Sequence, residues 1–214
     1  MQLGLFDAPG RAGLAVLRGF ALPHADALMA AIAGVTARAP FRHMMTPGGR
    51  ALSAAMSNCG QVGWVTDARG YRYTPEDPLS GDPWPAMPDV IRELAVAAAR
   101  EAGFAFAPDA CLINRYAPGA RMGLHSDADE PDGAAPIVSV SLGLPATFLF
   151  GGLARADATE KIALAHGDVV VWGGPLRRAY HGVAPLKAMN FLPKEGVHPI
   201  LGRQRINLTI RKAL

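Results

Sequence analysis

The segment 205–211, with the sequence RINLTIR, constrains the fold of this chain more than any other stretch. Side chains of an extended strand alternate between its two faces. Arg205, Asn207, Thr209 and Arg211 therefore share one face, while the three Ile and Leu residues between them share the other. The segment is predicted to be a strand whose apolar face packs against the core and whose polar face presents two guanidinium groups.

Short strands are predicted for most of the chain after residue 109. Segments of strand character, separated by turns that contain Gly, Pro or Asp, lie at 110–116, 137–142, 147–150, 161–164, 168–172, 179–183 and 205–210. Many short strands that follow early helices are typical of an α+β, mainly β fold. The expected core is a double-sheet antiparallel jelly roll with helices packed outside.

The part before residue 109 is predicted to hold two helices and a lid. Apolar residues recur at helical spacing over 23–36 and again over 88–102, where Asp89 is the candidate N-cap. Residues 40–87 are rich in Gly, Pro, Ser and Asn, and they fit short strands only at 61–65 and 71–74. We expect much of 40–87 to be loop or a substrate-recognition lid within a single domain, 1–214.

Composition limits the class of protein. Half of the 214 residues are hydrophobic, which argues against disorder, and no apolar run approaches the roughly 20 residues that span a bilayer. The first residues lack the basic start and apolar centre of a secretion signal. Two cysteines far apart in sequence predict no disulfide framework, and hence a cytoplasmic protein. The net charge of +3, mostly from arginine, is compatible with a phosphate-bearing partner.

His125 and Asp127 stand two residues apart, so both side chains can converge on one ion from the end of a strand. His181 is the candidate third ligand. Two imidazoles and one carboxylate suit a non-heme ferrous ion that keeps open positions for substrate and dioxygen. The remaining histidines, which are expected at the surface, are also available in principle: His24, His43, His166 and His198. A hydrolytic zinc site is the competing interpretation, although the chain has no His-Glu-x-x-His helix.

The polar face of 205–211 suits a dicarboxylate, because paired arginines bind carboxylates through bidentate hydrogen bonds. Asn114 and Tyr116 share one face of the strand 110–116, where they are candidates for two further donors to the same ligand. The alternative for Arg205 and Arg211 is an outward-facing edge strand with salt bridges. For Asn114 and Tyr116 the alternative is ordinary strand polarity.

Trp64 and Tyr71 lie in the loop-rich segment and are candidates for stacking on an extruded base. Packing against a helix is the commoner use of such residues. Asp129 and Glu130 directly follow the candidate ligands, where their charge would favour a cationic substrate. A solvated turn is the alternative for this pair, since Pro131 and Gly133 follow.

Ten ordered motifs carry a resemblance to a known family. They are 56–60 (MSNCG), 63–64 (GW), 70–73 (GYRY), 83–88 (PWPAMP), 114–121 (NRYAPGAR), 125–131 (HSDADEP), 135–143 (APIVSVSLG), 166–174 (HGDVVVWGG), 180–182 (YHG) and 205–211 (RINLTIR). From about residue 40 onward the chain closely resembles the AlkB family of iron(II)- and 2-oxoglutarate-dependent dioxygenases. That family has a double-stranded β-helix and repairs alkylated nucleobases by oxidative demethylation.

The resemblance implies a role for each motif residue. His125, Asp127 and His181 would hold Fe(II). The residues implied to bind 2-oxoglutarate are Asn114, Tyr116, Arg205, Asn207 and Arg211, and those implied to contact substrate are Trp64, Tyr71, Asp129 and Arg155. Dioxygen would be the second co-substrate.

The expected reaction converts 1-methyladenine and 3-methylcytosine to the unmodified bases, with release of formaldehyde, succinate and CO2. The expected partner is alkylated single- or double-stranded DNA, with RNA as a further possibility, and the expected state is a monomer. Two alternatives stay open: the same chemistry on RNA or a protein side chain, and a nucleic-acid-binding module without catalysis.

Overall fold

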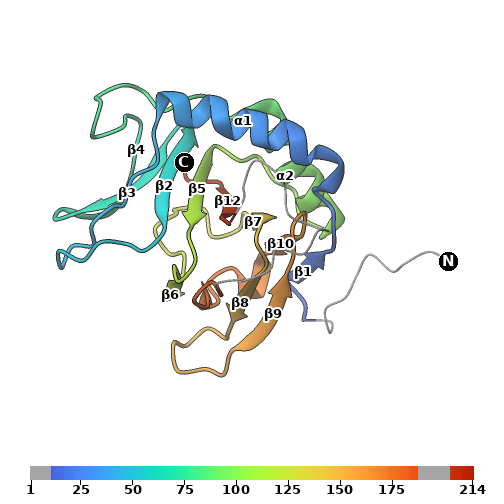
Figure 1. The fold of residues 1–214 in the computed structure, drawn as a ribbon. Helices are drawn as coiled ribbons and strands as arrows, with labels where there is room; N and C mark the ends of the chain where they lie inside the picture. The colour runs from blue at the N-terminus through green and yellow to red at the C-terminus, as the bar shows by residue number, and fades with distance from the viewer. Residues whose placement is uncertain (1–10, 188–202) are drawn as a thin grey trace.

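Two antiparallel sheets form the body of the protein in the computed structural model, which describes residues 11–187 and 203–214 (Figure 1). The six-stranded sheet has the order β1 (Leu14–Leu17), β10 (Val169–Trp172), β7 (Ile137–Gly143), β12 (Arg205–Arg211), β5 (Ala110–Tyr116) and β2 (Ala55–Gly60). The four-stranded sheet has the order β6 (Met122–His125), β11 (His181–Val183), β8 (Ala146–Phe150) and β9 (Glu160–Leu164). Most neighbouring strands are not consecutive in sequence, as expected of the predicted jelly roll.

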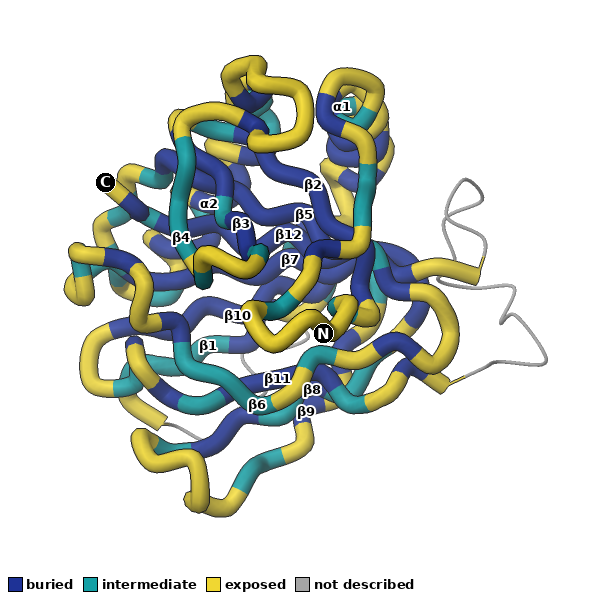
Figure 2. Tube along the Cα trace, turned by 90° about the vertical axis from the view of Figure 1, so that its left-hand side faces the viewer, coloured by how far each residue is buried: buried dark blue, intermediate teal, exposed yellow. Residues whose placement is uncertain are grey.

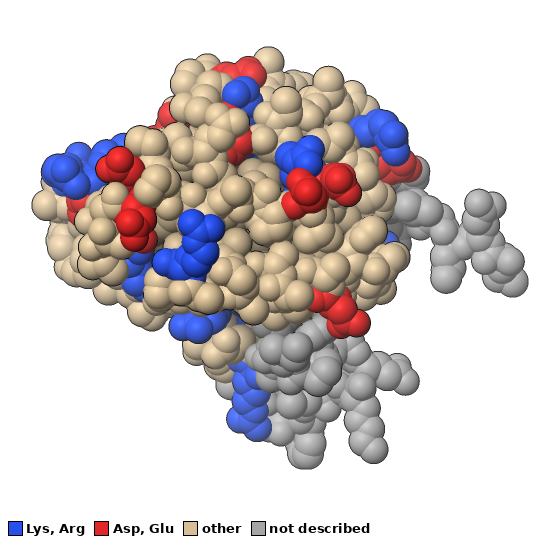
Figure 3. Space-filling view, turned by 90° about the horizontal axis from the view of Figure 1, so that it is seen from above, with Lys and Arg blue, Asp and Glu red and all other residues tan. Residues whose placement is uncertain are grey.

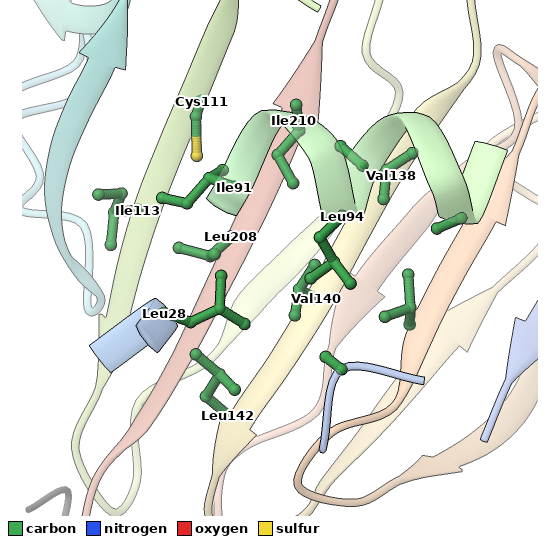
Figure 4. Close-up of a cluster of buried hydrophobic side chains, with 14 of the residues drawn as sticks. Leu28, Ile91, Leu94, Cys111, Ile113, Val138, Val140, Leu142, Leu208 and Ile210 are labelled. Carbon is green, nitrogen blue, oxygen red and sulfur yellow. The ribbon is translucent and has the colours of Figure 1, made fainter. Parts of the chain in front are cut away.

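Helices α1 (Ala25–Arg38) and α2 (Asp89–Glu101) cover the outer face of the six-stranded sheet. Leu28 of α1 and Ile91 and Leu94 of α2 belong to one buried cluster with Leu208 and Ile210 of β12 (Figure 4). The alternation predicted for β12 is therefore confirmed on its apolar side. Burial of such side chains is the main stabilising contribution in a core of this kind.

The N-cap of the second helix lies one residue earlier than the sequence indicated. Pro88 has an extended backbone, with ψ of 141°, and occupies the N-cap position. Asp89 is thus the first helical residue, and its carboxylate accepts a hydrogen bond from Arg92 instead of capping the helix. The prediction of Asp89 as the N-cap was wrong.

The predicted strands are present, with shifts of one or two residues at half of their ends, and three further strands were not predicted. The unpredicted strands are β1, β2 and β6. Strand β2 has the sequence AMSNCG, which lacks the β-branched and aromatic residues typical of strands. All six of its residues pair with β5, and this pairing fixes it in the sheet. Tertiary contacts, rather than local propensity, form this strand.

The hairpin of β3 (Gly63–Asp67) and β4 (Gly70–Thr74) is separate from both large sheets. Figure 2 shows that buried segments gather in the central strands β5, β7 and β12 and that exposed segments lie in the connections. The hairpin falls within the predicted lid, whose limits of 40–87 stay a prediction, as does the single domain 1–214.

Three further features bear on the sequence predictions. Neither helix of the described residues is long and apolar enough to cross a membrane. On the face seen from above, basic and acidic side chains are intermixed (Figure 3), so the net positive charge does not form a single patch there. Cys59 and Cys111, far apart in sequence, are register partners on β2 and β5, and both are buried free thiols on the helix side of the sheet.

A candidate metal and dicarboxylate site

A cavity between the two sheets is lined by the polar face of β12 and by both candidate histidine ligands. Its walls include Leu112, Asn114, Tyr116, Met122, His125, Ser139, Phe148, Trp172, His181, Arg205, Asn207, Thr209 and Arg211. The six-stranded sheet supplies the arginine strand, and the four-stranded sheet supplies both histidines. The alternation of β12 is confirmed on its polar side as well.

His125 and His181 lie opposite each other because they are register partners on the antiparallel strands β6 and β11. Their ring centroids are 4.4 Å apart. Asp127 follows β6 by two residues and reaches the same point: its Oδ1 is 3.6 Å from His125 Nε2, and its Oδ2 is 3.8 Å from His181 Nε2. All three ligand atoms lie within 4.8 Å of one another. The structure thus brings together three residues from two distant parts of the sequence.

Backbone carbonyls orient both imidazole rings. His125 Nδ1 donates to Gly123 O at 2.9 Å, and His181 Nδ1 donates to Ala179 O at 3.0 Å. With Nδ1 protonated, each Nε2 is left with a free lone pair directed toward Asp127. Metal-binding histidines are fixed in this way by an acceptor on their second ring nitrogen. The two rings therefore already hold the tautomer that binds a metal.

Burial and charge set the protonation states that a metal site requires. Burial lowers the pKa of His181 to about 4, although the neighbouring Asp127 carboxylate acts in the opposite direction. Burial alone would raise the pKa of Asp127, but the charge of Arg211 and of the two histidines outweighs it and lowers this pKa. A neutral imidazole and an ionised carboxylate are the forms that bind a cation.

The other histidines of the described residues do not join this group. His24 lies in the 3-10 helix Leu22–His24, His43 bonds to Leu52 O at 2.8 Å, and His166 Nδ1 accepts from Gly143 N at 3.0 Å. His198 lies outside the described residues. Within 11–187 and 203–214, the group of His125, Asp127 and His181 is the one set of such side chains that could hold an ion.

Arg205 is a buried guanidinium, 1% exposed, in the wall of the cavity. Its Nη2 donates to Ser141 Oγ at 3.0 Å, and its Cζ lies 5.6 Å from the ring of Tyr116. Its Nε has no hydrogen-bond partner, and no carboxylate among the described residues lies within ion-pair distance. A buried charge without a counter-ion is costly, so this guanidinium suits an anionic ligand.

The interpretation of the arginine strand as an outward-facing edge is wrong. Strand β12 is hydrogen-bonded on both sides, to β5 and to β7, and is therefore interior to the sheet. Its register places Arg205 opposite Tyr116 and Asn207 opposite Asn114. The polar residues of two neighbouring strands consequently face the same cavity.

Asn114 and Tyr116 offer polar atoms to this cavity. Asn114 Oδ1 is buried without a hydrogen-bond partner in the described structure. Burial raises the pKa of Tyr116 to about 12, despite the charge of Arg205, so its hydroxyl remains a donor at neutral pH. Asn207 is satisfied internally, since its Nδ2 donates to Ser139 Oγ at 2.8 Å and its Oδ1 accepts from Thr209 at 2.9 Å.

These observations test whether iron and a dicarboxylate fit the residues present. The ligand atoms of the metal group converge, and buried polar atoms of Arg205 and Asn114 lack partners in the wall of the same cavity. Buried polar groups of folded proteins are normally hydrogen-bonded, so such atoms indicate a place for a ligand. The residues present therefore fit both an iron ion and a dicarboxylate.

Arg211, in contrast to Arg205, already has carboxylate partners. Its Nη2 and Nε donate to Asp127 Oδ2 at 2.7 and 2.9 Å, and its Nε lies 3.3 Å from Glu130 Oε1. Burial would lower the pKa of Arg211, but the charge of Asp127 outweighs it and raises this pKa. Arg211 is therefore bonded to a candidate metal ligand and also lines the cavity.

The predicted substrate residues are not part of the cavity lining, although Asp129 follows Asp127 of the metal group by two residues. Trp64 and Tyr71 stack across the β3–β4 hairpin with ring centroids 5.7 Å apart, and Trp64 Nε1 donates to the exposed Asp129 at 3.2 Å. Arg155 lies over the ring of Tyr180, 5.3 Å from its centroid. The contacts of Trp64, Tyr71, Asp129 and Arg155 with a substrate stay predictions.

Sequence reasoning missed a set of buried polar residues around the site. Glu130 is 5% exposed, so the solvated-turn interpretation is wrong for it, and its partners are Tyr73, Arg177 and Arg211. No local pattern marks Arg177. Ser139 and Ser141 alternate with apolar residues along β7, and this period of two was a usable signal for a polar cavity wall.

Comparisons with known proteins agree with this geometry. The profile of the 2OG-Fe(II) oxygenase superfamily matches residues 13–211. The chain belongs to the 2OG-Fe(II) oxygenase superfamily. It is 54% identical to "Alpha-ketoglutarate-dependent dioxygenase AlkB" of Salmonella typhimurium, over 97% of this chain and 94% of that protein. It is 44% identical to the AlkB homolog of Caulobacter vibrioides, over 87% and 81% of the two chains.

The solved structure of OsALKBH1 has a TM-score of 0.81 with this chain at 27% identity, and the match covers 96% of this chain and 99% of that one. The superfamily uses Fe(II) and 2-oxoglutarate, and the chain is accordingly a 2-oxoglutarate-dependent dioxygenase. This membership confirms the resemblance to the AlkB family, and it sets aside the hydrolytic zinc enzyme and the non-catalytic binding module.

Proposed function

We propose that this dioxygenase removes N-methyl groups from 1-methyladenine and 3-methylcytosine in DNA. The observation that carries the proposal is the position of Asp129. Two residues after Asp127 of the metal group, its carboxylate accepts a hydrogen bond from Trp64 of the hairpin. An aromatic ring and a carboxylate are thus in contact two residues from the metal group, and this combination suits a flat, cationic ring.

In this proposal His125, Asp127 and His181 hold the iron. When bound, the iron supplies the oxidation of the methyl group by dioxygen, coupled to the conversion of 2-oxoglutarate to succinate and CO2. Arg205 binds the distal carboxylate of 2-oxoglutarate, and Tyr116 donates a hydrogen bond to the same ligand. Asn114, Asn207 and Arg211 line the rest of its site.

The remaining residues select the substrate. A methylated base that cannot pair normally is easily unstacked, so a flipping enzyme encounters it more often. Trp64 offers a face on which the extruded base stacks, with Tyr71 beside it. Asp129 lies within reach of the positive charge of the ring, and Arg155 offers a cation to the phosphate backbone.

The test is incubation with an oligonucleotide that contains 3-methylcytosine, with and without Fe(II) and 2-oxoglutarate. Formaldehyde release that requires both additions supports the proposal. A panel of methylated DNA, methylated RNA and methylated peptide separates the alternatives, since preference for RNA or peptide over DNA contradicts the proposed substrate. Single- and double-stranded forms of the same oligonucleotide define the strand preference.

We also propose that the enzyme acts as a monomer in the cytoplasm. The free thiols of Cys59 and Cys111 support a reducing compartment. Light scattering after size-exclusion chromatography measures the oligomeric state, and a dimer mass would contradict the monomer.

A further inference from the structure

We propose that Arg177 is a positioning residue that fixes the segment carrying the metal ligand Asp127. The inference rests on the proposed role of Asp127 in holding iron. Arg177 directly follows the short helix η2 (Gly174–Leu176) and precedes His181 by four positions. The residues that it contacts are 42 to 50 positions away in the sequence, and no motif of the sequence singles it out.

The guanidinium of Arg177 makes three contacts with one segment of chain. Its Nη1 donates to the carbonyl of Asp127 at 3.0 Å, its Nη2 lies 3.2 Å from Glu130 Oε2, and its Nε donates to Ala135 O at 2.8 Å. The segment 127–135 contains no helix or strand. The planar guanidinium of one arginine therefore bonds to the start, the middle and the end of a segment that has no helical or strand hydrogen bonds to hold it in place.

The ion pair between Arg177 and Glu130 is buried, with side-chain exposures of 4% and 2%. Removing two charges from water is costly, and a buried pair is tolerated only when its geometry and remaining hydrogen bonds are complete. Here every nitrogen of the guanidinium has an acceptor. Such a pair contributes little to stability compared with apolar packing. Its role is therefore to hold the segment in one conformation.

Glu130 extends the arrangement to the other side of Asp127. Its Oε1 accepts from the hydroxyl of Tyr73 and lies 3.3 Å from Arg211 Nε, and Arg211 in turn donates to the Asp127 carboxylate. Arg177 thus holds the backbone of Asp127, while Arg211 holds its side chain. Both guanidinium groups share Glu130 as their counter-ion.

Tyr73 links the same group to the hairpin. It is the register partner of Trp64, whose Nε1 donates to Asp129 at 3.2 Å. Two adjacent acidic residues, Asp129 and Glu130, therefore bind one face of the hairpin. By fixing 127–135, Arg177 sets both the position of Asp127 relative to the histidines and the position of Asp129 against Trp64.

The experiment measures Co(II) affinity of the metal-free protein, by titration of the visible absorption of Co(II), without 2-oxoglutarate or DNA. We expect Arg177→Met to weaken Co(II) binding on the order of 10- to 100-fold, as is usual when an outer residue that orients a ligand is removed. Arg177→Lys keeps the charge and restores one contact of three, so its affinity is expected to be intermediate. Arg92→Met, an exposed arginine on α2, is the matched control and is expected to bind like wild type.

Amide hydrogen exchange over 127–135 gives the second readout, with faster exchange expected in Arg177→Met. A purely structural role would lower the unfolding temperature and leave the Co(II) affinity of the folded protein unchanged. That result would overturn the inference. If Arg177→Met does not fold, Arg177→Lys and Glu130→Gln provide the same test, and wild-type Co(II) affinity in both would overturn it.

The same measurements separate this inference from the proposed function. If Asp127→Ala leaves Co(II) affinity unchanged, Asp127 is not a ligand and both proposals fail. If the wild-type enzyme forms succinate but releases no formaldehyde from methylated DNA, the proposed substrate is wrong. In that case weaker Co(II) binding by Arg177→Met would still support the positioning role.

Discussion

Arg211 Nη2 lies 2.7 Å from Asp127 Oδ2, so the last residue of the arginine strand is bonded to a candidate metal ligand. Arg205, six residues earlier on the same face of β12, has no such partner among the described residues. Two arginines that are equivalent in the sequence pattern therefore have different surroundings. The difference leads to the first prediction.

Arg205→Met is expected to raise the 2-oxoglutarate concentration required for half-maximal succinate release by about 10- to 100-fold. This factor corresponds to the loss of hydrogen bonds to a charged group, roughly 1.5–3 kcal/mol. Co(II) affinity should stay as in wild type. Arg211→Met is expected to raise the 2-oxoglutarate requirement and also to weaken Co(II) binding, because it removes the two hydrogen bonds that orient the Asp127 carboxylate. Equal effects of the two substitutions on Co(II) affinity would contradict the assignment.

Asp127→Ala is expected to abolish succinate release and metal binding. The substitution removes the only anionic member of the metal group and leaves the buried Arg211 with one acidic partner, Glu130. Asp89→Ala, at an exposed position of α2, is the matched control. Near-normal succinate release from Asp127→Ala would show that the metal lies elsewhere.

Asp129→Asn is expected to lower kcat/KM for 3-methylcytosine about fivefold, while kcat/KM for the neutral base 1-methylguanine stays within twofold. The carboxylate is exposed, so its attraction for a cationic ring is limited to about 1 kcal/mol. Trp64→Ala should reduce both values, because stacking does not depend on charge. An equal loss on both bases in Asp129→Asn would refute a role in charge recognition.

The metal-free protein is expected to lose stability as the pH falls from about 6.5 toward 4. The pKa of His181 is about 4 in the folded protein, below the ordinary value of 6.5, so the unfolded chain binds more protons in this window. The groups that face His181, namely Asp127 and His125, are part of the same site. The loss at pH 5 is expected to be about 2 kcal/mol.

Urea unfolding at pH 7 and pH 5 measures this loss. His181→Asn removes the titrating ring, and the pH dependence of its unfolding free energy is expected to be smaller by that amount. An identical pH dependence in wild type and His181→Asn would contradict the prediction.

Much of the site could be predicted from the sequence because its residues are close together in the chain and follow the two-residue repeat of a strand. The polar and apolar faces of β12 follow directly from the alternation of side chains along a strand, and His125 and Asp127 share a short motif. The third ligand is different. His181 joins them only because β11 pairs with β6, and long-range strand pairing has no local signal.

The missed elements have the same cause. Strand β2 consists largely of small and polar residues, and its conformation comes from pairing with β5 rather than from its own propensity. Glu130 belongs to a motif, but Pro131 and Gly133 beside it also fitted a solvated turn, and Arg177 belongs to no motif. Charged residues near Pro and Gly usually lie at the surface. Their mutual burial is a property of the packed chain.

The six-stranded sheet also separates the thiols from the centre where oxidation takes place. Cys59 and Cys111 lie among the side chains under the helices, whereas the neighbouring Leu112 and Asn114 face the cavity. Any oxidant that escapes productive turnover meets Met122, Trp172 and Phe148 in the cavity wall before it meets either thiol. Damage from idle turnover should therefore accumulate on Met122 and the aromatic rings, and the two cysteines should remain reduced in aged enzyme.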